Sequence, residues 1–343
     1  MAENKPLLIT DDYEGYETRY PDLLTISNEQ FEKQIWYASE ILVEEEDRLE
    51  MLYKLDARQQ EVVKRILPIF RKYEIDVSRF WTNVYPNFFK APECIEGSAV
   101  INVIELATHA RFYDKINKVF GTDTDEHYLS YLDDPTFKER AKWLGTTLQD
   151  KDLKKVCLVY GMVEGVILFS LFALLRSFQA NGYNLIATTV KGTKQSAMDE
   201  LLHSRYLTKS FNYYYKELNQ SFEDDKEYLN ILLNECHNLV EMEIFILKQV
   251  LGVKEGDNLD EVEFNSIKLS SYIDLVKVLA NDYFIRLGAK TLPFPEVNEC
   301  ELHSWFVTQT VAYAEPDFFS KGKSKEYESS WNKEGFIKCW RKK

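Results

Sequence analysis

The chain has 343 residues, of which 45% are apolar and 29% charged, with only 13 glycines and 9 prolines. This composition is typical of a soluble globular protein with a large core, folded as one large domain or as two. The net charge of -14 argues against a nucleic-acid or membrane surface, because phosphate-rich partners need clustered lysine and arginine.

Cysteine use and the N-terminus both favour a cytoplasmic protein. An odd number of cysteines without CxxC spacing suits reduced thiols better than a disulfide framework, and we expect no structural zinc. The first twenty residues carry acidic groups where a signal peptide would have a basic region and a long apolar run. The five cysteines are Cys94, Cys157, Cys236, Cys300 and Cys339.

Helical periodicity dominates the chain from its N-terminal part onward. The segments "APECIEGS" and "QANGYN" are predicted to be connections, and "GVKEGDN" is predicted to end a helix in glycine. No alternation typical of strands persists, and no repeat of fixed period is present, so we expect an all-α fold. The predicted helices span about 27–46, 56–82, 96–119, 134–144, 151–180, 188–218, 224–252 and 265–288.

One predicted helix is apolar on nearly all sides. It contains "VCLVYGMVEGVILFSLFALLRSF", residues 156–178, which comes nearest to the ~20 apolar residues of a membrane span but is interrupted by Glu164. We expect this helix at the centre of a large helical domain. Glu164 is then a carboxylate in a dry environment.

The composition of the sequence changes near residue 289, where the helical periodicity ends. "AKTLPFPEVNEC" contains two prolines, and the residues after it mix aromatics with lysine, serine and glutamate. We expect an irregular end that docks on a partner, with a frayed terminus as the alternative. The predicted division is an N-terminal extension (1–26), a helical domain (27–290) and a C-terminal segment with a tail (291–343).

Acidic residues stand in the predicted core helices, where an unpaired carboxylate is strongly disfavoured. Besides Glu164, the sequence places Glu200 and His203 three residues apart and Glu105 and His109 four residues apart, each pair on one helical face. A further candidate, Glu74, follows an apolar stripe. The stripe consists of Ile66, Leu67, Ile69 and Phe70.

Together these residues form the ligand inventory of a di-iron or di-manganese site in a ferritin-like helical bundle. Two cations can share bridging carboxylates and bind one imidazole each. Taken singly, each member has another interpretation: a Glu/His pair is usually a surface pair, and a lone buried Glu164 could be a neutral, hydrogen-bonded acid. Their joint occurrence, in the order Glu, Glu/His, Glu, Glu/His, favours the metal site.

These segments resemble the small, radical-generating subunit of class I ribonucleotide reductase, over roughly residues 27–327. "MDELLHSRYL" is similar to a helix of that family and implies metal ligation by Glu200 and His203, with Asp199 in a supporting role. "VEGVILFSLF" is similar to the helix that carries the central carboxylate, here Glu164. "HARFY" is similar to the segment in which a histidine ligand precedes the radical tyrosine, here Tyr113.

The resemblance also extends to both ends of the chain. "WYASEI" is similar to a tryptophan segment, which implies that Trp36 relays electrons and is linked to the metals through Asp199 and His109. "RLGAKTLPFP", Trp305 and "DFFSKGKSKEY" resemble the closing segment, which implies a homodimer whose tail docks on the large subunit. Tyr327 would pass the oxidising equivalent between subunits. Other aromatics of the tail are alternatives: Phe318, Phe319, Trp331 and Trp340.

Two departures from the family pattern stand out. The family usually spaces its first Glu/His pair three residues apart. Here the residue three before His109 is Leu106, and Glu105 precedes His109 by four. A π-bulge, which absorbs one extra residue, would let both side chains bind the metals. Counted from Glu105, the tyrosine position falls on Phe112, so the radical could lie on Tyr113 or on the metals.

The second departure concerns Glu74, which stands where most members have aspartate and where a manganese/iron subgroup without the tyrosyl radical also has glutamate. Asp76 is an alternative ligand. We expect an iron pair, with Mn/Fe and Mn/Mn as alternatives.

The resemblance implies that the metal pair stores one oxidising equivalent for the large subunit, which itself binds and reduces ribonucleotides. Accordingly, the sequence has neither a Walker loop nor a GxGxxG motif. Leu168, Phe169 and Phe172 would shield the radical from water. The alternatives are another ferritin-like oxidase or oxygenase that acts directly on a bound substrate, and an iron store or helical scaffold, which the chain's length and aromatic tail fit badly.

Overall fold

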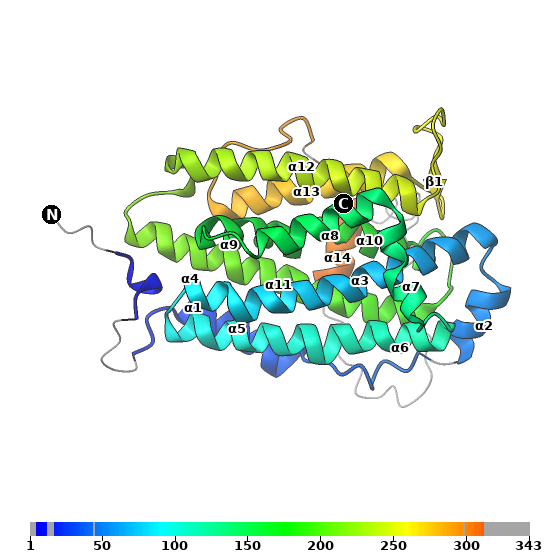
Figure 1. Ribbon diagram of the computed structural model, residues 1–343, viewed down its shortest axis with the longest axis horizontal. Helices are drawn as coiled ribbons and strands as arrows, with labels where there is room; N and C mark the ends of the chain where they lie inside the picture. The colour runs from blue at the N-terminus through cyan, green and yellow to red at the C-terminus, as the bar shows by residue number, and fades with distance from the viewer. Residues whose placement is uncertain (1–4, 12–16, 44, 298, 312–343) are drawn as a thin grey trace, which may run out of the picture.

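The computed structural model describes residues 5–11, 17–43, 45–297 and 299–311. They form an elongated bundle whose long helices run along its longest axis (Figure 1). The expected all-α fold is confirmed. Within the described residues, strands occur only as the short antiparallel hairpin of β1 (Glu263–Phe264) and β2 (Ile267–Lys268).

Four long helical segments form the centre of the bundle. Helix α3 packs on the segment formed by α5, η3 and α6, while α11 packs on the segment formed by α9, η5 and α10. Here η3 and η5 are π-helical turns within otherwise α-helical segments. The bounds are α3 (Ala57–Asn83), α5 (Pro92–Ile104), η3 (Glu105–His109), α6 (Ala110–Phe120), α9 (Leu153–Met162), η5 (Val163–Ile167), α10 (Phe169–Arg176) and α11 (Ala187–Glu217).

Further helices surround this centre. Helix α12 packs on α8, α9 and α3, helix α13 on α10, α11 and η5, and helix α1 on α5 and α11. The remaining bounds are η1 (Leu7–Ile9), α1 (Pro21–Asn28), η2 (Glu29–Gln34), α2 (Glu45–Tyr53), α4 (Tyr85–Phe88), α7 (Asp125–Leu129), η4 (Ser130–Asp133), α8 (Pro135–Thr147), η6 (Ser177–Gln179), η7 (Phe222–Asp224), α12 (Lys226–Val250), α13 (Leu269–Leu287) and α14 (Glu301–Val311).

Helix α3 shows how the local sequence determines an element of the bundle. It begins with a capping box, in which the Asp56 side chain accepts from the Gln59 backbone N–H (2.8 Å) and the Gln59 side chain accepts from that of Asp56 (3.0 Å). The apolar stripe predicted from residue 66 to residue 70 is buried in the core. The stripe therefore directs one face of α3 inward.

The predicted helix over 27–46 is correct only as far as Gln34. Helix α1 starts earlier, at Pro21, passes into the π-helical turn η2, and the chain becomes extended at Ile35. This change of direction brings Trp36 into the core, where it is 6% exposed and hydrogen-bonded to Asp199. A tertiary contact thus overrides the helical pattern.

Two further expectations about connections had different outcomes. "APECIEGS" is not a connection, because Pro92 is the first residue of α5, a position where its missing N–H has no intrahelical partner to lose. "QANGYN" does form a turn, with positive φ at Asn181 and Gly182, and Gly252 follows the end of α12 with a φ of 68°.

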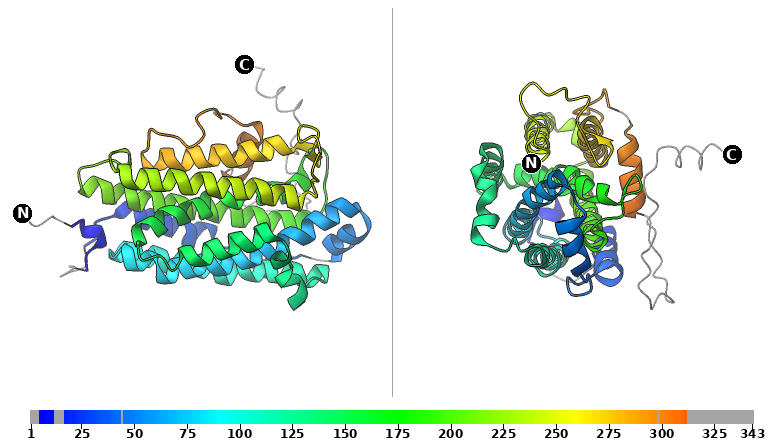
Figure 2. Two further views of the ribbon diagram at one scale, coloured as in Figure 1. Left: turned by 45° about the horizontal axis from the view of Figure 1, so that its top comes forward. Right: turned by 90° about the vertical axis from the view of Figure 1, so that its right-hand side faces the viewer.

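The C-terminal segment was predicted to be irregular, but part of it forms helix α14, which packs on α13 and α11. In Figure 2, α14 (orange) lies along one flank of the bundle. Its Trp305 is 6% exposed, with the Arg176 guanidinium 5.5 Å from its ring. The predicted docking tail beyond residue 311, including Tyr327, lies outside the described residues.

The apolar helix of residues 153–179 is buried as expected. By length and composition it could cross a membrane, but all residues of its most apolar stretch are buried inside the structure. The four cysteines within the described residues are also buried, and none is in a disulfide. Cys339 lies outside those residues.

Close helix packing gives a test of the fold. Gly97 of α5 lies against the buried Tyr206 of α11, and a Cβ at this glycine would lie 2.2 Å from the tyrosine ring. We predict that Gly97→Ala lowers the free energy of unfolding by about 1–3 kcal/mol, measured by urea denaturation. Gly145→Ala in α8 is the control, because no atom lies within 4 Å of its Cβ position. It should gain up to about 1 kcal/mol. Equal stability of both variants would contradict the packing.

Candidate metal centre

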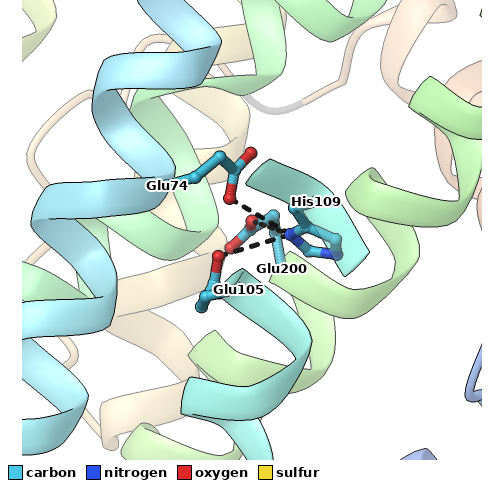
Figure 3. A group of neighbouring side chains, drawn as sticks. All are labelled: Glu74, Glu105, His109 and Glu200. Carbon is cyan, nitrogen blue, oxygen red and sulfur yellow. Dashed lines mark hydrogen bonds and ion pairs between the residues drawn. The ribbon is translucent and has the colours of Figure 1, made fainter. Parts of the chain in front are cut away.

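All six predicted ligands lie together in the middle of the bundle, and each is at most 1% exposed. They form two groups of four, and within each group the candidate ligand atoms lie within 4.8 Å of one another. Glu105 and Glu200 belong to both groups, as bridging carboxylates would. The first group is Glu74, Glu105, His109 and Glu200 (Figure 3), and the second is Glu105, Glu164, Glu200 and His203.

Each histidine directs Nδ1 toward three carboxylates. His109 Nδ1 lies 3.2 Å from Glu74 Oε2, 3.3 Å from Glu105 Oε2 and 3.3 Å from Glu200 Oε1. His203 Nδ1 lies 2.8 Å from Glu105 Oε1, 3.3 Å from Glu164 Oε2 and 3.4 Å from Glu200 Oε2. Each group therefore combines three carboxylates with one imidazole.

The backbone reaches this arrangement through π-helical turns. Glu105 and His109 are the first and last residues of η3, so the π-bulge that the resemblance implied, from one residue more than the family's usual spacing, is present. The wider turn accommodates that extra residue. Glu164 lies in a second π-helical turn, η5, which no spacing in the sequence predicts.

The residues present fit a pair of cations. Four carboxylates enclosed in an apolar core are strongly disfavoured without compensating charge. Glu74 Oε1 is buried without a hydrogen-bond partner. Both oxygens of Glu105 and Glu200 Oε2 are buried as well, and each lies near a histidine Nδ1 atom, the position that a cation shared with that imidazole would take. Oxygen-rich ligands with one imidazole for each metal suit iron or manganese.

Before cations bind, protons would compensate the charge of the cluster. Burial raises the pKa of Glu74 and of Glu164 well above the usual range. Burial alone would lower the pKa of each histidine, but the surrounding carboxylates outweigh it, so the pKa of His109 and of His203 is raised well above its usual value. Cations that bind here must displace these protons, so we expect weaker metal binding as the pH falls.

A hydrogen-bonded chain leads away from His109. Its Nε2 lies 2.9 Å from Asp199 Oδ2, and the same oxygen accepts from Trp36 Nε1 at 2.8 Å. The Trp36 ring also stacks on the His109 ring, with centroids 5.8 Å apart. The three residues that the family resemblance linked are therefore in direct contact.

Sequence reasoning missed two neighbours of the ligands. Trp81 Nε1 donates to Glu164 Oε1. Trp81 follows Glu74 by seven residues on α3, so helical spacing could have indicated that it faces the cluster. The Gln30 side-chain amide lies 2.6 Å from His203 Nε2. Gln30 lies in η2, and no pattern in the sequence predicts its position.

Tyr113 is enclosed in apolar surroundings beside the cluster. Its ring stacks on Phe70 with centroids 4.9 Å apart, and Phe70 stacks in turn on Phe172. The Tyr113 hydroxyl is buried without a hydrogen-bond partner, although the Ser196 side chain faces it. Burial, followed by the charge of Glu74, raises the pKa of Tyr113 well above its usual value, so the phenol is neutral.

The remaining predicted residues lie as follows. Phe112 is buried and meets the edge of the Trp36 ring. Asp76, the alternative ligand, pairs with Lys72 and Arg79 and belongs to neither four-residue group. The predicted shielding residues, Leu168, Phe169 and Phe172, are all buried.

Comparison with known proteins identifies the family. No curated protein sequence matches the chain. Residues 14–298, however, match the sequence model of the family described as "Ribonucleotide reductase, small chain". The chain belongs to this family. It is therefore a radical-generating small subunit of ribonucleotide reductase, an oxidoreductase with a dinuclear metal site.

Solved structures of small subunits share this fold at low sequence identity. The R2 subunit from Clostridium botulinum is 17% identical, with a TM-score of 0.71 over 85% of this chain and 89% of that one. Dimanganese(II)-NrdF from Streptococcus sanguinis is 16% identical, with a TM-score of 0.69 over 85% and 98%. The Rnr4 homodimer from Saccharomyces cerevisiae is 14% identical, with a TM-score of 0.65 over 85% and 90%. They confirm the predicted ferritin-like fold.

The ligand groups predict a metal content. The purified small subunit should bind about two iron or manganese ions per chain, measured by elemental analysis after loading. Glu200→Ala and His203→Ala should each abolish binding of the pair, because Glu200 belongs to both groups and His203 carries the only imidazole of the second group. The control is Glu241→Ala, at an exposed position of α12. Normal metal content in both ligand variants would refute the assignment.

Proposed function

We propose that the six clustered side chains would hold the dinuclear centre of this small subunit, with Glu105 and Glu200 within reach of both metal positions. The observation that carries the proposal is that these two carboxylates are common to both groups. Each metal position then has one imidazole and one carboxylate of its own. The proposed ligands are Glu74, Glu105, His109, Glu164, Glu200 and His203.

The proposed home of the stored radical is Tyr113. When bound, the metal pair supplies the oxidising power that removes one electron from the phenol. Tyr113 must release its hydroxyl proton at the same time, because its buried phenol is neutral before the electron leaves. The stacked Phe70 and Phe172 rings exclude water, which protects the oxidised ring.

For the metals we propose an iron pair, which oxygen-rich ligands with one imidazole for each metal suit. Manganese is the second candidate, as Mn/Fe or Mn/Mn. Two observations favour manganese. Glu74 stands where most members have aspartate but where a manganese/iron subgroup has glutamate, and the similar structure from Streptococcus sanguinis is a dimanganese protein. Elemental analysis of the protein purified from its native source distinguishes these possibilities.

The exit route of the oxidising equivalent is proposed to run through His109, Asp199 and Trp36. Their hydrogen bonds of 2.9 and 2.8 Å connect a metal ligand to an indole in the segment between η2 and α2. We further propose that the tail docks on the large catalytic subunit, with Tyr327 as the residue that passes the equivalent across. The homodimer, as in the Rnr4 structure, and the cytoplasmic location are proposals of the same kind.

Family membership favours this role over that of a ferritin-like oxidase or oxygenase acting directly on a substrate. Such an enzyme would need a substrate channel that reaches the metals. Two pockets formed by the described residues, one between α3 and α8 and one beside Arg205 and Arg286, are lined by none of the six proposed ligands. A metal-loaded protein that oxidised a small molecule without its large subunit would support the alternative.

Replacing the proposed radical residue provides a spectroscopic test. Tyr113→Phe should abolish the tyrosyl electron paramagnetic resonance signal of the oxidised protein while leaving about two metals per chain. The control is Tyr160→Phe, another buried tyrosine, whose hydroxyl donates to the Leu144 carbonyl at 3.2 Å. It should retain the signal. A tyrosyl signal that survives in the Tyr113 variant would place the radical elsewhere.

Blocking the proposed exit route should separate radical formation from turnover. Trp36→Phe removes the indole N–H that donates a hydrogen bond to Asp199 Oδ2. We predict a normal tyrosyl signal but a loss of about 10–100-fold in ribonucleotide reduction with the large subunit. Trp143→Phe, at a half-buried position of α8, is the control and should keep full activity. Full turnover by the Trp36 variant would exclude this route.

A further inference from the structure

A buried ion pair lies outside the metal cluster. Arg140 of α8 and Glu243 of α12 are 2% and 0% exposed, and Nη1 of the arginine donates to Glu243 Oε2. Ser170 Oγ of α10 donates to the other oxygen of the same carboxylate. A buried pair adds little net stability, because desolvation of two charges offsets their attraction. Its contacts indicate a different role.

The first contact is with the π-helical turn that carries Glu164. Arg140 Nη2 donates to the backbone carbonyl of Ile167 at 3.2 Å. Ile167 is the last residue of η5, three residues after Glu164, and Ser170 follows in the first turn of α10. The ion pair therefore holds the backbone of this segment at its C-terminal end through Ile167 and Ser170.

The second contact is with the helix that carries Glu74. The Arg140 guanidinium lies over the Tyr73 ring, 5.2 Å from its centroid, within the range of a cation–π interaction. Tyr73 directly precedes Glu74 on α3. One guanidinium therefore contacts both segments whose carboxylates, Glu74 and Glu164, belong to a single ligand group each.

We propose that Arg140, held in place by Glu243, is a positioning residue that fixes α3 against η5 and thereby sets the separation of the two metal positions. The inference rests on the proposed metal centre. Arginine suits the task because its planar guanidinium presents donors in fixed directions and a face for an aromatic ring. Here Nη1, Nη2 and the face contact three different helical segments. A lysine ammonium could not make all three contacts from one position.

The test removes both charges at once, so that no unpaired buried charge remains. Arg140→Met/Glu243→Met should fold with an unfolding midpoint in urea close to that of the unmodified protein, because apolar replacement of a buried pair is often neutral or stabilising. Cobalt(II) titration of the metal-free protein, followed by visible absorption, then reports the centre. We expect at least one metal to bind about 10–100-fold more weakly, with an altered absorption spectrum.

The matched control is Arg176→Met. Arg176 is also a buried arginine, on α10, but its guanidinium lies over the rings of Trp305 and Phe306, each at 5.5 Å. This variant should lower the urea midpoint and leave the cobalt affinities and spectrum unchanged. If it alters the centre as strongly as the double variant does, the effect is a general one and the proposal is overturned.

The remaining outcomes are also decisive. If the unmodified protein fails to bind two cobalt ions, the proposed metal centre itself fails, independently of Arg140. If it binds two and the double variant has the same affinities and spectrum, Arg140 positions nothing. Should the double variant not fold, Arg140→Lys replaces it, because the ammonium can still pair with Glu243 but cannot also contact Ile167 and Tyr73. A folded Arg140→Lys protein with an unchanged cobalt spectrum would overturn the proposal, and a changed one would support it.

Discussion

The structure depends on one electrostatic constraint, which is that four carboxylates must coexist in a buried, largely apolar core. Glu105 and Glu200 lie between the two histidines, and burial disfavours every negative charge in the cluster. Protons can compensate these charges, as the raised pKa values of Glu74 and Glu164 show, and cations can replace the protons. The apolar helices around the cluster keep water out, so the same burial that disfavours the free carboxylates strengthens their hold on metal ions.

Departures from regular helix concentrate at this cluster. The turn η3 carries Glu105 and His109, η5 carries Glu164, and η2 carries Gln30, which contacts His203. In each π-helical turn, the regular α-helical backbone hydrogen bonds are interrupted. A side chain then points toward the cluster that α-helical spacing would direct elsewhere. The backbone thus adapts to the ligand geometry, and neighbouring side chains such as Arg140 contact the adapted segments from outside.

The ligand cluster could be predicted from the sequence better than the path of the backbone. Spacing along each helix is local, so Glu200 with His203, and Glu105 with His109, could be paired from their positions in the chain. The π-bulge at the second pair was indicated only by its departure from the family's usual spacing. The extended segment at Trp36 and the helix α14 depend on contacts between distant parts of the chain, namely with Asp199 and with Arg176. For the same reason, Gln30 and the Arg140–Glu243 pair leave no signal in a single sequence.

Burial of the cysteines has a consequence for a protein that handles strong oxidants. A thiol reacts with peroxides and disulfides chiefly as its thiolate, and burial raises the pKa of Cys236 to about 12 and that of Cys157 well above its usual value. Cys94 and Cys300 are shifted in the same direction. At neutral pH these four sulfurs therefore stay protonated and out of reach, so stray oxidant should damage exposed aromatic side chains such as Tyr53 before it reaches them.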